Sequence, residues 1–233
     1  MIRPAMLAAL SLLAACNAPD YTPVRDWART ASLAADDPVL GATRPPTEPD
    51  GVLAMQEALA TYLAALARMA DDGVLPYMEN PFVELATRAA SADPAGGEAV
   101  SSIGTTLRRA TRSNWRAPHL RDAIVIFDPS VQRLVSALAE GAVRLGPSAP
   151  PAADARPPAA GRAVSEHPSI LQARADYADV VRRIGEGHAL LKERAAHITR
   201  GAAVQAILAQ QDQLRRAMQA LPRPVVTVPA APP

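Results

Sequence analysis

The arginines of residues 105–119 have the types and spacing best suited to binding chemistry in this 233-residue chain. Arg108, Arg112 and Arg116 are four residues apart, so a helix would place them on one face, and Arg109 adjoins the first of them. Guanidinium groups bind phosphate and carboxylate oxygens in bidentate fashion. Residues 105–119 contain no Asp or Glu. Two interpretations follow: the set contacts an anionic surface, or acidic residues of a neighbouring helix neutralise it.

Residues suited to catalysis or metal binding are few and scattered. Glu193 and His197 are four residues apart, and we expect a surface pair, because di-iron helical bundles need two Glu-x-x-His motifs and two further Glu. The sequence contains no His-Glu-x-x-His motif, paired cysteines, glycine-rich phosphate loop or Gly-x-Ser-x-Gly turn. We therefore expect no metal ion, no cofactor and no enzymatic activity.

The single cysteine, Cys16, follows an apolar run that begins at Ala5 and is preceded by Arg3. This run is too short to span a bilayer as a helix, which needs about 20 residues, and it suits the apolar region of a signal peptide. The segment Leu13-Ala14-Ala15-Cys16 resembles the lipobox of bacterial lipoproteins. The resemblance covers the first 16 residues only, and it identifies a class of processing rather than a functional family.

The resemblance implies a lipid anchor. In bacterial lipoproteins the cysteine thiol receives a diacylglycerol, the signal peptide is removed before that residue, and the new amine receives a fatty acid such as palmitate. Two or more acyl chains hold a protein stably on a membrane, whereas one binds reversibly. Asn17 follows Cys16, and the absence of Asp there favours the outer membrane. We therefore expect a protein of the bacterial cell envelope, anchored to the outer membrane and facing the periplasm.

Composition indicates an all-α fold. Hydrophobic residues make up 49% of the chain but aromatic residues only 3%, and alanine, which has the highest helix propensity, supplies much of the apolar content. Removal of Arg3 with the signal peptide leaves 23 basic and 23 acidic residues. A chain without net charge is not steered toward nucleic acid, so we expect no nucleic-acid partner.

Apolar periodicity predicts an antiparallel helical bundle with a long heptad-patterned C-terminal helix. Narrow apolar seams occur in residues 50–72 and 98–117, residues 119–127 form a short helix, and Asp128-Pro129 begins another helix that reaches residue 145. Gly73 is suited to a left-handed helix end, and residues 94–97 read as a break. The heptad positions of the last helix, which is expected to weaken near Gly201, are Ile170, Tyr177, Ile184, Leu191 and Ile198.

The predicted organisation has six parts. They are a signal peptide (1–15), a lipidated tether with a short helix and a linker (16–49), a helical bundle (50–145), a Pro/Ala-rich linker (146–168), a long C-terminal helix packed on the bundle (169–221) and a disordered tail (222–233).

Two aromatic features have alternative interpretations. Trp27, flanked by Arg25 and Arg29, either touches lipid headgroups or docks the first helix on the bundle. The loop of residues 71–82 either contacts a partner or tucks its aromatic residues onto the end of the bundle.

The sequence thus predicts a membrane-anchored helical lipoprotein that acts as a non-catalytic interaction or scaffold protein, with an envelope protein as partner. The alternatives are a helical protein that binds a small ligand between its helices and, third, an envelope hydrolase.

Overall fold

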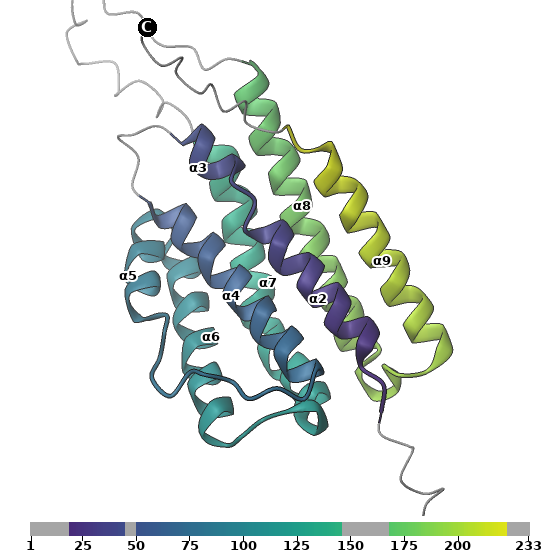
Figure 1. The fold of residues 1–233 in the computed structure, drawn as a ribbon. Helices are drawn as coiled ribbons and strands as arrows, with labels where there is room; N and C mark the ends of the chain where they lie inside the picture. The colour runs from purple at the N-terminus through teal and green to yellow at the C-terminus, as the bar shows by residue number, and fades with distance from the viewer. Residues whose placement is uncertain (1–18, 45–49, 146–167, 223–233) are drawn as a thin grey trace, which may run out of the picture.

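The computed structural model describes residues 19–44, 50–145 and 168–222, and all regular structure in these ranges is helical. The expected all-α fold class is therefore confirmed (Figure 1). The α-helices are α2 (Thr22–Ala35), α3 (Val39–Thr43), α4 (Gly51–Ala70), α5 (Val83–Ala92), α6 (Pro94–Arg112), α7 (Leu120–Arg144), α8 (Pro168–Glu193) and α9 (Gly201–Ala220), and short 3-10 turns η2 (Ala117–His119) and η3 (Ala195–His197) precede α7 and α9.

Neighbouring helices run mostly antiparallel along one bundle axis (Figure 1). The closest pairings are α7 with α8 and α2 with α4, while α5 and α6 pack together beside α4. Alanines on α2 and α4 are fully buried at these contacts, so the helix backbones approach closely. Trp27 is buried as well and packs against Gly187 of α8, which confirms that it docks the first helix on the bundle.

Helix α7 is continuous from Leu120 to Arg144, although the sequence predicted two helices meeting at Asp128-Pro129. An interior proline costs a helix about 3 kcal/mol. Four side chains around it are at most 1% exposed, and burying each contributes about 1.5–3 kcal/mol. These residues are Ile124, Phe127, Val131 and Leu134. Their burial along one uninterrupted face outweighs the cost of the proline.

The C-terminal segment of residues 169–221 is not one helix. The heptad-patterned helix is α8, which ends at Glu193, and the chain then turns and returns alongside it as α9 (Figure 1). The expected interruption therefore comes just before Gly201. Ile198 continues the heptad spacing but lies in the turn, where its side chain is 1% exposed. Because the turn buries this residue, the apolar pattern runs on after the helix has ended.

Two glycines predicted to break the chain belong to the first turn of α6. The helix begins at Pro94, and the Asp93 carboxylate accepts a hydrogen bond of 2.7 Å from the backbone N–H of Gly96. A Cβ atom on Gly96 would lie 2.4 Å from the Met55 sulfur, and one on Gly97 would lie 2.6 Å from Ala90 Cβ. Glycine is therefore required here for close packing on α4 and α5.

The left-handed residue after α4 is Asp72, with φ 52°, and not Gly73 as predicted. Gly73 instead donates its N–H to the Arg68 carbonyl, and a Cβ atom there would lie 2.7 Å from Arg68 Cγ. Helix α6 ends at Arg112 rather than at residue 117, and Asn114 has φ 50°. The loop of residues 71–82 buries Phe82 and exposes Met78.

Helix α3 lies within residues 36–49, where only a linker was expected. None of the helices in the described ranges has both the length and the apolar content needed to cross a membrane. The signal peptide, Cys16, residues 146–167 of the Pro/Ala-rich linker and nearly all of the C-terminal tail lie outside the described residues.

Candidate functional site

A chain of buried polar side chains connects three helices in the centre of the bundle. Tyr62 of α4 and His188 of α8 are fully buried, and Asp128 of α7 is 5% exposed. The Tyr62 hydroxyl lies 2.7 Å from His188 Nε2, and His188 Nδ1 lies 3.1 Å from Asp128 Oδ1. A carboxylate only accepts, so Nδ1 carries the proton, and the Tyr62 hydroxyl donates to Nε2.

Two further donors complete the environment of the Asp128 carboxylate. Lys192 Nζ donates to Oδ2 over 2.6 Å, and Gln132 Nε2 donates to Oδ1 over 3.2 Å and to the Gly185 carbonyl over 3.0 Å. The hydrogen bond from His188, followed by those from Lys192 and Gln132, holds the pKa of Asp128 well below its usual range. Charge and hydrogen-bonding capacity are therefore balanced inside the cluster.

Burial shifts the other two groups toward their neutral forms. It lowers the pKa of His188 below 6.5, against the opposing effect of Asp128, and it raises the pKa of Tyr62 well above 10. The Tyr62 ring also packs on Phe127, with ring centroids 4.9 Å apart. A tyrosine, a histidine and an aspartate in a row resemble a proton relay. With Tyr62 and His188 at 0% exposure, this row has no access for a substrate and holds α4, α7 and α8 together.

Sequence reasoning missed this cluster, although a signal was present. The α8 seam alternates spacings of four and three residues through Ile170, Arg174, Tyr177, Val181, Ile184, His188 and Leu191. Two of these positions are polar, so the pattern places a buried histidine and a buried arginine on the core face. Asp128 was read as the start of a helix, which concealed its position on the buried face of α7.

Arg174 is the second polar residue of that seam, and it is fully buried. Its guanidinium donates to the backbone carbonyl of Thr43 and lies 3.4 Å from the Thr43 hydroxyl. Nearby, the Tyr177 hydroxyl donates to the Ala35 carbonyl over 2.7 Å. These bonds fasten the connection between α2 and α4 to α8, which is a structural role.

The arginines singled out by sequence are at one end of the bundle. Arg108, Arg109 and Arg112 are exposed on the outer face of α6. Arg116 lies beyond the end of the helix, in extended backbone. The predicted helix face that carries Arg108 and Arg112 therefore does not include it. Its Nε atom donates to Asn114 Oδ1 over 3.2 Å. We refer to these four residues as the arginine set.

The acidic neighbours that would neutralise the arginine set are not found in the described part of the chain. Over residues 19–44, 50–145 and 168–222, Arg108, Arg109 and Arg112 have neither an ion pair nor a hydrogen bond from the guanidinium. Arg121, at the start of α7, has a buried Nε atom without a hydrogen-bond partner in the same ranges. This end therefore carries positive charge that the described residues do not neutralise.

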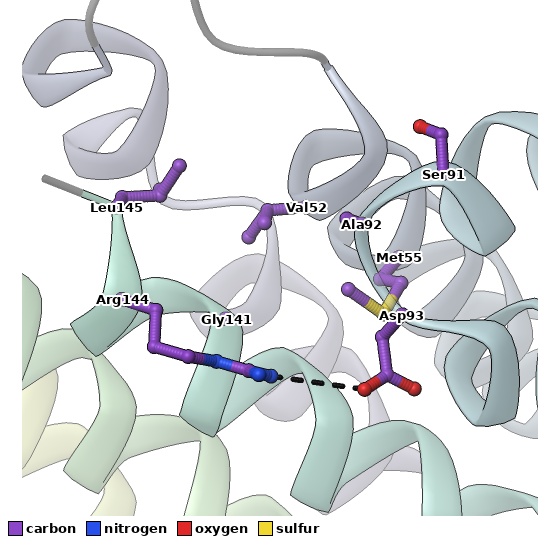
Figure 2. A pocket seen from close by; sticks show the side chains of 8 residues that line it. All are labelled: Val52, Met55, Ser91, Ala92, Asp93, Gly141, Arg144 and Leu145. Atoms are coloured by element: carbon purple, nitrogen blue, oxygen red, sulfur yellow. Dashed lines mark ion pairs between the residues drawn. The ribbon is translucent and has the colours of Figure 1, made fainter. Parts of the chain in front are cut away.

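Surface hollows are shallow. One of about 220 Å³ opens between the start of α4, the end of α5 and the end of α7, where the Arg144 guanidinium reaches across to Asp93 at 3.7 Å (Figure 2). Val52, Met55 and Gly141 also line it, so its lining combines apolar residues with the ion pair between Arg144 and Asp93. A larger groove, of about 690 Å³, runs between α2 and α4 past Leu33, which is 69% exposed.

Neither a metal site nor a similarity to known proteins identifies this chain. In the ranges described above, no group of three or more His, Cys, Asp or Glu side chains is placed to hold a metal ion. Glu193 ends α8 and pairs with Arg194, while His197 lies in η3, so these two are not on one helix. The chain matches no known protein family model, no curated protein and no solved structure.

Proposed function

We propose that this chain is a lipid-anchored protein of the bacterial cell envelope, and that its helical body is a non-catalytic scaffold that binds another envelope component. The anchor is Cys16, in the segment Leu13-Ala14-Ala15-Cys16. The scaffold part rests on one observation above all. The side chains best able to perform chemistry, Tyr62, His188 and Asp128, are enclosed in the core and satisfy one another.

The outer surface supports an interaction role. Several large apolar side chains are more than half exposed, among them Leu33 on α2 and Val83 at the start of α5. The groove beside Leu33 is lined by Ala64, Ala67 and Arg68 of α4, which gives an apolar floor with a charged edge. Protein interfaces combine such apolar centres with polar rims. The hollow of Figure 2, at about 220 Å³, is smaller than the roughly 300–1,000 Å³ typical of small-ligand pockets, whereas the groove beside Leu33, at about 690 Å³, lies within that range.

Metabolic labelling with an alkyne-tagged palmitate in the native bacterium tests the anchor. We expect the wild-type protein to incorporate label and to sediment with the envelope fraction. The Cys16→Ser variant should lose both properties, because it lacks the thiol that receives the diacylglycerol. A wild-type protein without label would refute the anchor.

Photo-crosslinking in the same cells tests the scaffold. A photoreactive residue at Leu33 should give one discrete crosslinked species, whereas one at Leu208, which is 38% exposed on α9, provides a matched control. Crosslinks that are equally weak at both positions would argue against a partner on the groove between α2 and α4.

A further inference from the structure

The start of the described chain and the arginine set are at the same end of the bundle. Pro19 and Tyr21, before α2, line one hollow of about 410 Å³ together with Ala117 and Pro118, which directly follow Arg116. The backbone N–H of Ala117 donates to Asp72, in the turn after α4, over 3.2 Å. Figure 1 shows the starts of α2, α7 and α9 and the ends of α4, α6 and α8 gathered at this end.

The covalent chain limits how far the anchor can be from this end. Three peptide units separate Cys16 from Pro19, and an extended chain spans at most about 3.6 Å per residue. Cys16 is therefore within about 11 Å of Pro19, whichever path the chain takes. If acyl chains on Cys16 enter a bilayer, this end of the bundle is the end closest to the headgroups.

Charge differs between the two ends. At the far end, Arg88 pairs with Asp50 over 2.6 Å and Arg144 pairs with Asp93 over 3.7 Å. At the near end, Asp71 is occupied by Arg25 and Arg29, at 3.1 and 3.0 Å. The guanidinium groups of Arg108, Arg109 and Arg112 have no such partner among the residues described. The near end therefore carries three clustered arginines whose charge is left available for an external anion.

We propose that the arginine set binds the anionic phosphate headgroups of the membrane that holds the lipid anchor, so that the bundle stands with this end against the bilayer. This inference rests on the lipid anchor of the proposed function. An arginine near an anionic membrane surface favours contact by roughly fivefold, so four of them favour this orientation by roughly 10²–10³-fold. The hollow of Figure 2 then faces away from the membrane.

Trp115, which directly precedes Arg116 in the sequence and is partly buried against the core, provides a built-in reporter of this contact. The only other tryptophan, Trp27, is 1% exposed in the core. The lipidated full-length protein is reconstituted on liposomes of phosphatidylcholine with or without 30% phosphatidylglycerol, to which a headgroup spin-labelled lipid is added as quencher. Subtracting the signal of a Trp115→Phe variant leaves the quenching of Trp115 alone. We expect strong quenching on the anionic liposomes and little on the neutral ones.

Two variants with equal loss of charge separate a local contact from a general charge effect. The Arg108/Arg109/Arg112/Arg116→Gln variant should lose most of the quenching, whereas the matched Arg182/Arg183/Arg215/Arg216→Gln variant, altered on α8 and α9, should retain it. Far-UV circular dichroism confirms that each variant is folded. In 1 M salt, where the Debye length is about 3 Å, quenching should collapse while the protein stays on the liposomes.

Flotation distinguishes the two proposals. The headgroup contact would be refuted, and the anchor retained, if the protein floats with the liposomes but Trp115 quenching is equal on neutral and anionic lipid. Equal quenching in the two arginine variants would have the same meaning. Protein from the native bacterium that fails to float would overturn the anchor and the orientation that depends on it.

Discussion

Acid should destabilise this protein through His188, and the pH interval below the ordinary pKa of histidine sets an upper limit on the effect. Burial lowers the pKa of His188 from its ordinary value of 6.5, so the folded state holds this side chain neutral where the unfolded chain protonates it. The unfolded state then binds more protons than the folded state, and the free energy of unfolding falls as the pH falls. The contribution is fully present above pH 6.5 and is lost progressively below it.

For each pH unit below 6.5 at which His188 stays neutral in the folded protein, the free energy of unfolding falls by about 1.4 kcal/mol. Between pH 7.5 and pH 5.0 the loss therefore reaches up to about 2 kcal/mol. Asp128 adds to the effect in the same direction, but only at lower pH, because its lowered pKa favours the folded state until the carboxylate is protonated. Protonation at Nε2 would also oppose the hydrogen bond that Tyr62 donates over 2.7 Å.

Urea unfolding at pH 7.5, 6.5, 5.5 and 5.0, followed by circular dichroism, measures this dependence. A His188→Gln variant serves as the reference, because glutamine keeps a polar side chain in the core but does not titrate. We expect the free energy of unfolding of the wild type to fall more steeply with acid than that of the variant. Parallel pH profiles for the two proteins would show that His188 is not the group responsible.

Three substitutions test the packing and the hydrogen bonds directly, each measured by urea unfolding at pH 7.5. Gly187→Ala should destabilise the fold by about 1–3 kcal/mol, since its Cβ atom would lie 2.5 Å from Trp27 Cζ2. Tyr62→Phe should cost about 1–3 kcal/mol, because His188 Nε2 is then left buried without a donor. Asn114→Ala should cost about 1–2 kcal/mol, since alanine is strained at φ 50°.

Gly201→Ala is the matched control for Gly187→Ala, because a Cβ atom at Gly201 meets nothing within 4 Å. It should leave the stability unchanged or raise it slightly. If the two glycine substitutions have equal effects, close packing of α8 on Trp27 is not what requires glycine at position 187. A Tyr62→Phe variant as stable as the wild type would mean that the hydrogen bond to His188 contributes nothing measurable.

Local patterns in the sequence were enough to predict that the described body is helical and where most of its apolar faces lie. The seam of residues 50–72 became α4, with Met55, Leu59 and Leu66 fully buried as their spacing required. The arginine set was also visible as a pattern, although the turn at Asn114 separates Arg116 from the others. Helical periodicity repeats within a few residues, so a short stretch of sequence carries it completely.

Only the tertiary structure decided which faces meet and which helices are continuous. His188 contacts Asp128, which is 60 residues away in the sequence, and Tyr62, which is 126 residues away. The spacing of neighbouring residues predicts neither contact. Pro129 sits inside α7 because burial on α4 and α8 outweighs its cost, and the C-terminal segment turns back where Ile198 enters the core. Such choices depend on the free energy of contacts between distant segments, which a local pattern does not contain.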